Sequence, residues 1–357
     1  MKFQSELLKF FLKEWLLIAS AVGFALTSIY TQHLPVYSLQ EMQILFILFV
    51  LFISVKGLEH SGFFLKLSQS IEKGKFIPLK LIIATFFLSM IITNDITLIV
   101  IVPLTLSLSV NRRDILVILE ALAANAGSAL TPFGNPQNLF IYWFYNLSPT
   151  QFVSSIIPFS FVFLCLLVIS SFIVKSKSNS HYPSKLRKVE NSAYIYGLLL
   201  IIVLLTVLRI LPVLAGLLVI FYALLFDRKS MRVDYALLLS FFFFFGLAEN
   251  MKLILVTEIS HSEHVFIFSA LASQIMSNVP TALLFAKFTA RWKALLWGTN
   301  VGGFGSLLGS LANLIAYKLY ITHENTNNST SFTLKFLTIG YLAFSIGIGL
   351  YFILEKM

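Results

Sequence analysis

Long apolar stretches separated by short polar ones cover almost the whole chain. Between Trp15 and Leu354 most of these stretches lack the polar face that a surface helix of a soluble protein shows; Phe241–Phe245, five consecutive phenylalanines, is the extreme case. Stretches of this length and composition are typical of helices that lie in a lipid bilayer. The pattern therefore predicts a chain of membrane helices.

One stretch, Leu122–Tyr145, has the length of a membrane span but an interior unsuited to a continuous helix. It contains Pro132 and Pro136, which lack a backbone N–H and clash with the preceding turn, and the helix-destabilising Gly127 and Gly134. We therefore predict a broken helix over about residues 115–145.

A second stretch, Asn300–Tyr320, repeats the pattern of the first without a gap and predicts another broken helix over about residues 294–320. Seven residues recur at the same spacing: Asn125, Gly127, Gly134, Asn138, Leu139, Tyr142 and Tyr145 correspond to Asn300, Gly302, Gly309, Asn313, Leu314, Tyr317 and Tyr320. Matching Gly/Pro-interrupted segments in the two halves of a chain indicate the binding site of a secondary transporter.

A short polar segment between two apolar arms precedes each broken helix. These segments are Thr93–Thr97, with the sequence TNDIT, and Ser277–Thr281, with the sequence SNVPT. The arms around the first have about 15 residues each, whereas a spanning helix needs about 20. We therefore predict two hairpins, over about residues 78–110 and 265–290.

Basic residues suggest that the first hairpin is re-entrant. Lys75 and Lys80 precede it and Arg112 and Arg113 follow it, so the positive-inside tendency places both of its ends on the cytoplasmic side. A single kinked span is the alternative, and it would place Arg112 and Arg113 outside.

The composition agrees with an all-α polytopic membrane protein. Hydrophobic residues make up 58% of the chain and charged residues 12%, which is more apolar surface than one soluble core can bury. The net charge of +10 comes from basic residues scattered between spans, so we expect it to set orientation and not to bind nucleic acid. This distribution places the N-terminus in the cytoplasm and the C-terminus outside. The single cysteine, Cys165, excludes an intramolecular disulfide.

The basic segment Lys175–Glu190 divides the chain into two repeats. We predict a first repeat over residues 1–174, a cytoplasmic basic linker over residues 175–191 and a second repeat over residues 192–357. The charge distribution makes the two hairpins open to opposite sides of the membrane, as in inverted repeats.

The four interruptions predict a polar site in the middle of the bilayer. Non-helical backbone is tolerated at that depth only inside protein or beside a water-filled cavity. Helices that restart there point N–H groups and the positive end of the helix dipole at the site, which favours a small anion, while hydroxyl, amide and carbonyl oxygens suit sodium. The alternative is that these residues only cap the broken helices. The candidate site residues are Thr93, Asn94, Asp95, Thr97, Gly134, Asn135, Asn138, Ser277, Asn278, Thr281, Gly309, Ser310 and Asn313, of which Thr93, Asn94, Gly134, Ser277, Asn278 and Gly309 are candidate sodium ligands.

Asp95 is the carboxylate closest to this predicted site. An unpaired charge in the membrane is costly, so we expect Asp95 to bind a cation, carry a proton or pair with a buried base; the alternative is a structural contact to a neighbouring amide. Glu120, Glu249 and Lys287 lie near predicted span ends, where we expect them at the interface.

No enzymatic motif is present in the chain. The sequence lacks HExxH, GxSxG and a Gly-rich phosphate loop with lysine, so we expect no cofactor and no enzyme.

In four segments the chain resembles the ion transporter superfamily, which includes divalent anion:sodium symporters, arsenite permeases and citrate-transporter-like proteins. The segments are TNDITLIVIVP, GSALTPFGNPQNL, SNVPTALL and GSLLGSLANLI, and the resemblance, over about Trp15–Leu354, is closest to small bacterial inner-membrane anion permeases. It implies two inverted repeats with re-entrant hairpins and unwound helices, a homodimer and elevator-type movement.

The resemblance also carries over to individual residues. A Ser-Asn-Thr motif at the hairpin tips of this family matches Thr93 and Asn94 in the first half and Ser277 and Asn278 in the second. The third position departs, being Asp95 and Val279, which argues against a dicarboxylate ligand. The unwound-helix positions correspond to Gly134, Asn135 and Asn138 and to Gly309, Ser310 and Asn313.

These observations favour a secondary active transporter of a small anion in the cytoplasmic membrane, coupled to sodium or protons. One alternative is a sodium/proton antiporter or an arsenite-type exporter, in which Asp95 is the exchanging carboxylate. A membrane-embedded enzyme or a channel belongs to a different class, and the first would need a catalytic cluster that is not visible.

Overall fold

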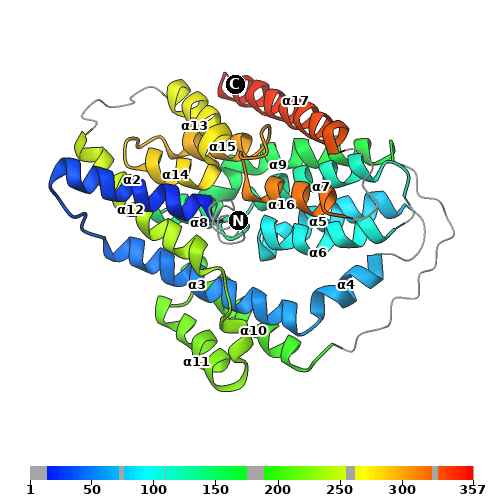
Figure 1. The fold of residues 1–357 in the computed structure, drawn as a ribbon, viewed down its shortest axis with the longest axis horizontal. Helices are drawn as coiled ribbons and strands as arrows, with labels where there is room; N and C mark the ends of the chain where they lie inside the picture. The colour runs from blue at the N-terminus through cyan, green and yellow to red at the C-terminus, as the bar shows by residue number, and fades with distance from the viewer. Residues whose placement is uncertain are drawn as a thin grey trace, which may run out of the picture.

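The computed structural model describes residues 14–71, 76–108, 110–174, 189–254, 262–323 and 329–356, which form helices joined by loops (Figure 1). Most of the predicted linker over residues 175–191 lies outside this part. Four helical stretches are long and apolar enough to cross a membrane: α3 (Leu39–His60), α9 (Pro149–Ser171), Arg228–Ile254, which contains η2 (Arg228–Met231) and α12 (Tyr235–Ile254), and α17 (Ser329–Glu355). The prediction of an all-helical chain with apolar spans is confirmed.

One set of helices, which we call the frame group, is built around α3 and α12. In it α2 packs along α12, and α3 packs along α10 and α11. Asn250 of α12 fixes the first pair, because its Nδ2 donates to the hydroxyl of Ser28, 2.8 Å away. The frame group comprises α2 (Trp15–Thr31), α3, α10 (Ser192–Val207), η1 (Val213–Gly216), α11 (Leu217–Phe226) and α12.

The second set, the interrupted group, contains four places where one helix ends and the next begins within a few residues. The helix pairs α5–α6 and α13–α14 meet at single residues, whereas α7–α8 and α15–α16 are joined by short loops. These breaks fall within the ranges predicted for the hairpins and the broken helices. The group comprises α5 (Ile77–Ile92), α6 (Asn94–Ser107), α7 (Arg113–Ser128), α8 (Pro136–Phe144), α13 (Ser262–Met276), α14 (Asn278–Ala286), α15 (Trp292–Gly302) and α16 (Leu311–Ile321), with α4 (Phe63–Ile71) and α9 packed against it.

Glycines allow the helices of the interrupted group to approach closely in both halves. A Cβ at Gly127 of α7 would lie 2.1 Å from the carbonyl oxygen of Phe86 in α5. In the other half, a Cβ at Gly298 of α15 would lie 2.6 Å from the carbonyl oxygen of Phe266 in α13. Contacts this short exclude a side chain, so α7 lies directly against α5 and α15 lies directly against α13.

Two expectations about charged residues are wrong. Glu120 is fully buried, and it accepts a hydrogen bond from the hydroxyl of Thr105 in α6. It lies inside the bundle because α5, α6, α9 and α16 pack around α7. Lys287, whose side chain is 11% exposed, does not extend away from the protein but forms ion pairs with Glu41 and Glu249.

Candidate functional site

The two single-residue junctions have the same backbone conformation. Thr93 has φ 76° and ψ 152°, and Ser277 has φ 75° and ψ 155°. Residues with a side chain rarely adopt positive φ, and for β-branched Thr93 the conformation is strained. The hydroxyls of Thr97 and Thr281, one turn later, donate to the carbonyl oxygens of Thr93 and Ser277, both at 2.8 Å. Four of the predicted site residues thus form one local structure that occurs twice.

Each junction is bonded to the helix break of its own half. The backbone N–H of Asn94, the first residue of α6, donates to the carbonyl oxygen of Gly134 at 3.1 Å. In the other half, the N–H of Asn278 donates to the carbonyl oxygen of Gly309 at 2.9 Å. A Cβ at Gly134 would lie 2.5 Å from the carbonyl oxygen of Ser128, so this position needs glycine for the close approach.

The two helices that restart after the long breaks are capped in matching ways. Asn135 precedes α8 and Ser310 precedes α16, both with extended backbone. The side chain of each accepts a hydrogen bond from the N–H two residues later, on Gln137 and Ala312, at 3.3 Å in both cases. Capping is therefore part of what Asn135 and Ser310 do, as the alternative interpretation of the sequence expected.

Buried asparagines connect the two halves through crossed hydrogen bonds. Asn138 donates to the carbonyl oxygen of Ser128 at 3.0 Å and accepts from Asn300 of α15 at 2.9 Å. Asn313 accepts from Asn125 of α7 at 2.8 Å. Asn313 in turn donates to the carbonyl oxygen of Gly303, as Asn138 does to that of Ser128, so each asparagine makes the same two kinds of hydrogen bond. Each broken helix thus depends on the other half for one of its central hydrogen bonds.

Helices from opposite halves also pair at these breaks. α6 packs against α16, and α8 packs against α14. At the start of the first pair, Nδ2 of Asn94 lies 3.1 Å from Oδ1 of Asn125 and 3.4 Å from the hydroxyl of Ser310. At the far end of the second pair, the hydroxyl of Tyr145 donates to the carbonyl oxygen of Ala286 at 3.2 Å. The N-termini of four helices are consequently drawn together, and their dipoles favour negative charge between them.

A pocket of about 90 Å³ reaches the second-half part of this region. Ser277 and Ser310 line it, together with the loop and start of α16 (Leu307–Leu314), the beginning of α12 and the beginning of α2. Asp234, next to α12, and Lys318 of α16 supply charged groups at the pocket. Two of the predicted site residues, both buried, therefore border this pocket.

Asp95 contacts the asparagine network through its backbone, because its N–H donates to Oδ1 of Asn94 at 3.0 Å. Its own Oδ1 is buried and has no hydrogen-bond partner among the residues that the structure describes. A buried oxygen of this kind is a ready acceptor for a proton or a cation.

Carbonyl and amide oxygens at the breaks retain capacity to bind a cation. The carbonyl oxygens of Gly134 and Gly309 each accept one N–H and keep a second lone pair. Such oxygens suit sodium. Within the described ranges no group of three or more His, Cys, Asp or Glu side chains is placed to hold a metal ion.

Three residues at this site were not among the predicted site residues. Asn125 and Asn300 complete the crossed contacts, and their recurrence at the same spacing in the two broken helices was a signal for both. Gln137, in the first turn of α8, is fully buried, and neither its amide nitrogen nor its amide oxygen has a partner in the described part of the chain. Its counterpart in α16 is Ala312, so the repeat pattern could not indicate it.

Comparison with known proteins gives consistent matches. The profile of the family described as "Citrate transporter" matches residues 10–298. The chain is 35% identical over 298 residues to "Uncharacterized transporter MJ0456" of Methanocaldococcus jannaschii, covering 80% of this chain and 82% of that protein. It is also 35% identical over 285 residues to "Inner membrane protein YbiR" of Escherichia coli, covering 74% of this chain and 76% of that protein.

Proposed function

Because this chain belongs to the citrate transporter family, we propose that it is a secondary active transporter that moves a small anion, an inorganic oxyanion or a carboxylate, across the cytoplasmic membrane. The observation that carries the proposal is the pair of crossed contacts Asn125–Asn313 and Asn300–Asn138. These contacts bring the helix breaks of both halves to one place, which is where transporters of this kind bind their substrates.

The expected ligand is an anion because helix N-termini dominate the site. α6, α8, α14 and α16 all begin at the breaks, so the positive ends of their dipoles lie there. These dipoles favour a group such as a phosphate, a sulfate or a carboxylate. Sodium would be held by the oxygens at the same breaks, with Thr93, Asn94, Gly134, Ser277, Asn278 and Gly309 as ligands.

The coupling ion is sodium or a proton, and Asp95 is the residue that we assign to it. Asp95 lies two residues after the junction at Thr93, and its Oδ1 is buried without a hydrogen-bond partner among the described residues. A fixed negative charge would repel an anionic substrate at short range, which argues for contact with the ion and not the substrate.

The proposed movement is of the elevator type, between two inverted repeats with re-entrant hairpins. Equivalent contacts in the two halves support the repeats, and the division into a frame group and an interrupted group supports the movement. We assign the interrupted group to the moving part, and the frame group to the fixed part and to the contact in a homodimer. The N-terminus lies in the cytoplasm and the C-terminus outside in this proposal.

A sodium/proton antiporter or an arsenite-type exporter is the second candidate. The same observation at Asp95 favours it, because such exchange needs a carboxylate that binds two ions in turn. The two candidates differ in whether an anion binds together with the coupling ion.

Thermal unfolding of the purified protein in detergent tests the proposal. Sodium concentration and pH are varied against a panel of citrate, succinate, phosphate and sulfate. A ligand at 100 times its Kd stabilises the folded state by about 2.7 kcal/mol, which is readily measured as a rise in Tm. We expect one anion class to raise the Tm, and to do so more strongly with sodium or at low pH. Stabilisation by sodium or protons alone, with every anion of the panel inert, would favour the second candidate.

A further inference from the structure

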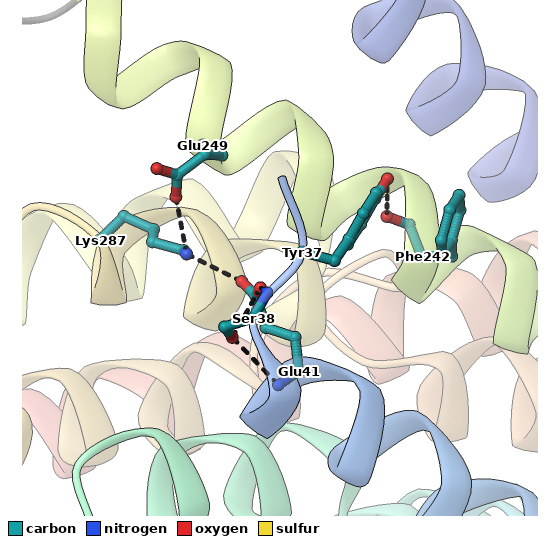
Figure 2. A network of polar contacts seen from close by, with 6 residues as sticks. All are labelled: Tyr37, Ser38, Glu41, Phe242, Glu249 and Lys287. Carbon is teal, nitrogen blue, oxygen red and sulfur yellow. Dashed lines mark hydrogen bonds and ion pairs between the residues drawn. The ribbon is translucent and has the colours of Figure 1, made fainter. Parts of the chain in front are cut away.

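A lysine of the interrupted group is bound between two carboxylates of the frame group. Nζ of Lys287, at the end of α14, lies 2.8 Å from Oε1 of Glu41 in α3 and 2.8 Å from Oε2 of Glu249 in α12 (Figure 2). The exposed fractions of the three side chains are 11% for Lys287, 4% for Glu41 and 31% for Glu249. The contact is therefore a largely buried cluster between the two groups of helices and not a surface ion pair.

The frame side of this cluster is held rigidly. Glu41 forms a capping box with Ser38, whose backbone N–H and hydroxyl donate to its Oε2 at 2.7 and 2.9 Å, which leaves Oε1 for Lys287. Tyr37 stacks on Phe242 of α12 and donates to its carbonyl oxygen at 3.1 Å (Figure 2). Burial, and next the charge of Glu41, raise the pKa of Tyr37 to about 12, so its hydroxyl remains a donor. Lys287 is the one member of the cluster that a movement of α14 would displace.

The cluster and the pocket lie at opposite ends of the same two helices. α12 begins at the pocket, which Leu237 and Ser240 line, and it reaches Glu249 after a rise of about 18 Å from Leu237. α14 begins next to Ser277 in the pocket and ends at Lys287, about 15 Å further on. Among the residues that the structure describes, the pocket therefore borders the site at one end of these helices, and the ion pairs join the two groups of helices at the other.

From this arrangement we infer that Lys287, Glu41 and Glu249 form an ion-pair gate that closes the site on the side opposite the pocket. The inference rests on the proposed function as a transporter. Opening to that side requires α14 to leave α3 and α12, which separates Lys287 from both carboxylates. Residues of the gate thus set how readily the protein changes the side to which it opens, without touching the substrate. By the predicted orientation, the closed side is the outside of the cell.

The burial of the cluster gives the gate its strength. Separating paired charges while they remain buried is strongly unfavourable, so the pairs separate only when water enters between the helices. Lys287 also lies 5.6 Å above the ring of Phe144 in α8, which belongs to the interrupted group like Lys287 itself. A movement of this group would therefore keep that contact and break only the two ion pairs with the frame group.

Thiol accessibility at both ends tests this inference in the full-length protein. Cys165 is exposed, so every variant carries Cys165→Ser to remove this thiol. Ala286→Cys, 3% exposed next to Lys287, reports on the gate, and Leu308→Cys, 42% exposed, reports on the pocket. A membrane-impermeant maleimide is applied to intact cells and to inside-out vesicles, so that each thiol is probed from both sides.

The test variant is Glu249→Gln, which removes the more exposed carboxylate and leaves Lys287 paired with Glu41. Labelling at Ala286→Cys should become about tenfold faster, and labelling at Leu308→Cys should slow, because a weakened gate shifts the population toward the other orientation. Glu249→Asp and Lys287→Arg keep the charges and should restore labelling rates close to the starting values. The double variant Lys287→Met with Glu41→Gln should act like Glu249→Gln. Replacing Glu41 as well avoids leaving an unpaired charge buried at that position.

Two results would overturn the gate. One is unchanged labelling at both positions; the other is faster labelling at Ala286→Cys with no decrease at Leu308→Cys, because this shows only local loosening of α14. Labelling does not depend on substrate, so it is separable from the proposed function. If the protein transports an anion but shows either result, the proposed function stands and the ion pairs do not form a gate.

Discussion

Asn125 donates its side-chain amide to Oδ1 of Asn313 at 2.8 Å, across the two halves of the chain. The matching bond from Asn300 to Asn138, at 2.9 Å, runs in the opposite direction. Neither broken helix is thus complete by itself, because the amide that orders its restart receives a hydrogen bond from the other half. A displacement of one half therefore changes the hydrogen bonds of the other half. A binding site that both halves form needs this coupling.

Asn125→Ala and Asn300→Ala should each lower the free energy of unfolding by about 1–3 kcal/mol, because each leaves a buried acceptor without its donor. Both should also weaken anion binding. Asn250→Ala is the matched control, since Asn250 is equally buried and hydrogen-bonded but lies in the frame group. We expect this control to lose similar stability in chemical unfolding and to keep ligand affinity. Equal loss of affinity in all three variants would remove the special role of the crossed contacts.

Gln137→Met should separate binding from stability. It keeps the side-chain volume and removes a buried amide without partners in the described residues, so the unliganded protein should be as stable as before or more stable by about 1 kcal/mol. If the amide contacts the transported anion, the Kd should rise about tenfold, measured from the ligand dependence of Tm. Gln137→Glu, of the same shape, should abolish anion binding by repulsion. A Gln137→Met protein with unchanged affinity would show that the amide serves another purpose.

Gly134→Ala and Gly309→Ala should each disturb the helix breaks. The added Cβ would lie 2.5 Å from the carbonyl oxygen of Ser128 in the first case and 2.6 Å from that of Gly302 in the second. We expect loss of transport together with lower stability. Gly197→Ala in α10 is the control, because no atom lies within 4 Å of its Cβ, and it should be neutral or stabilising by up to about 1 kcal/mol. Full transport by the Gly134→Ala protein would contradict the close packing of this loop.

Asp95→Asn should change the ion dependence of transport and not only its rate. The amide cannot carry a proton or a charge, so a dependence on sodium or on pH that rests on this residue should disappear. Anion affinity measured without sodium should stay the same or increase, since a repelling charge is gone. Ion dependence identical to that of the unmodified protein would exclude Asp95 from coupling.

The sequence predicted the positions of the helix breaks well because proline, glycine and polar residues inside apolar stretches have local consequences. Thr93 and Ser277 stand at the junctions between helices, and the restarts after Asn135 and Ser310 lie within the predicted broken helices. Local rules favour a break in such segments, since proline and glycine destabilise a helix and Ser, Thr and Asn cap its ends.

Contacts between distant segments could not be predicted in this way. The pairing of Lys287 with Glu41 and Glu249 joins three helices far apart in the sequence, and Lys287 considered alone indicated a position at the interface. Glu120 was misplaced for a related reason, because its burial depends on the helices that pack around α7. Gln137 has no counterpart in the second half, so only the structure shows that its amide is buried without a partner.

Uptake into proteoliposomes tests the central claim most directly. Purified protein is reconstituted, a sodium or proton gradient is imposed, and entry of radiolabelled citrate, succinate, phosphate and sulfate is followed with and without an ionophore that removes the gradient. We predict accumulation of one of these anions above its external concentration, lost with the ionophore and lost in a protein that carries Asn138→Ala and Asn313→Ala. Uptake that never exceeds equilibration, or that persists in this double variant, would contradict a gradient-driven carrier whose site lies at the helix breaks.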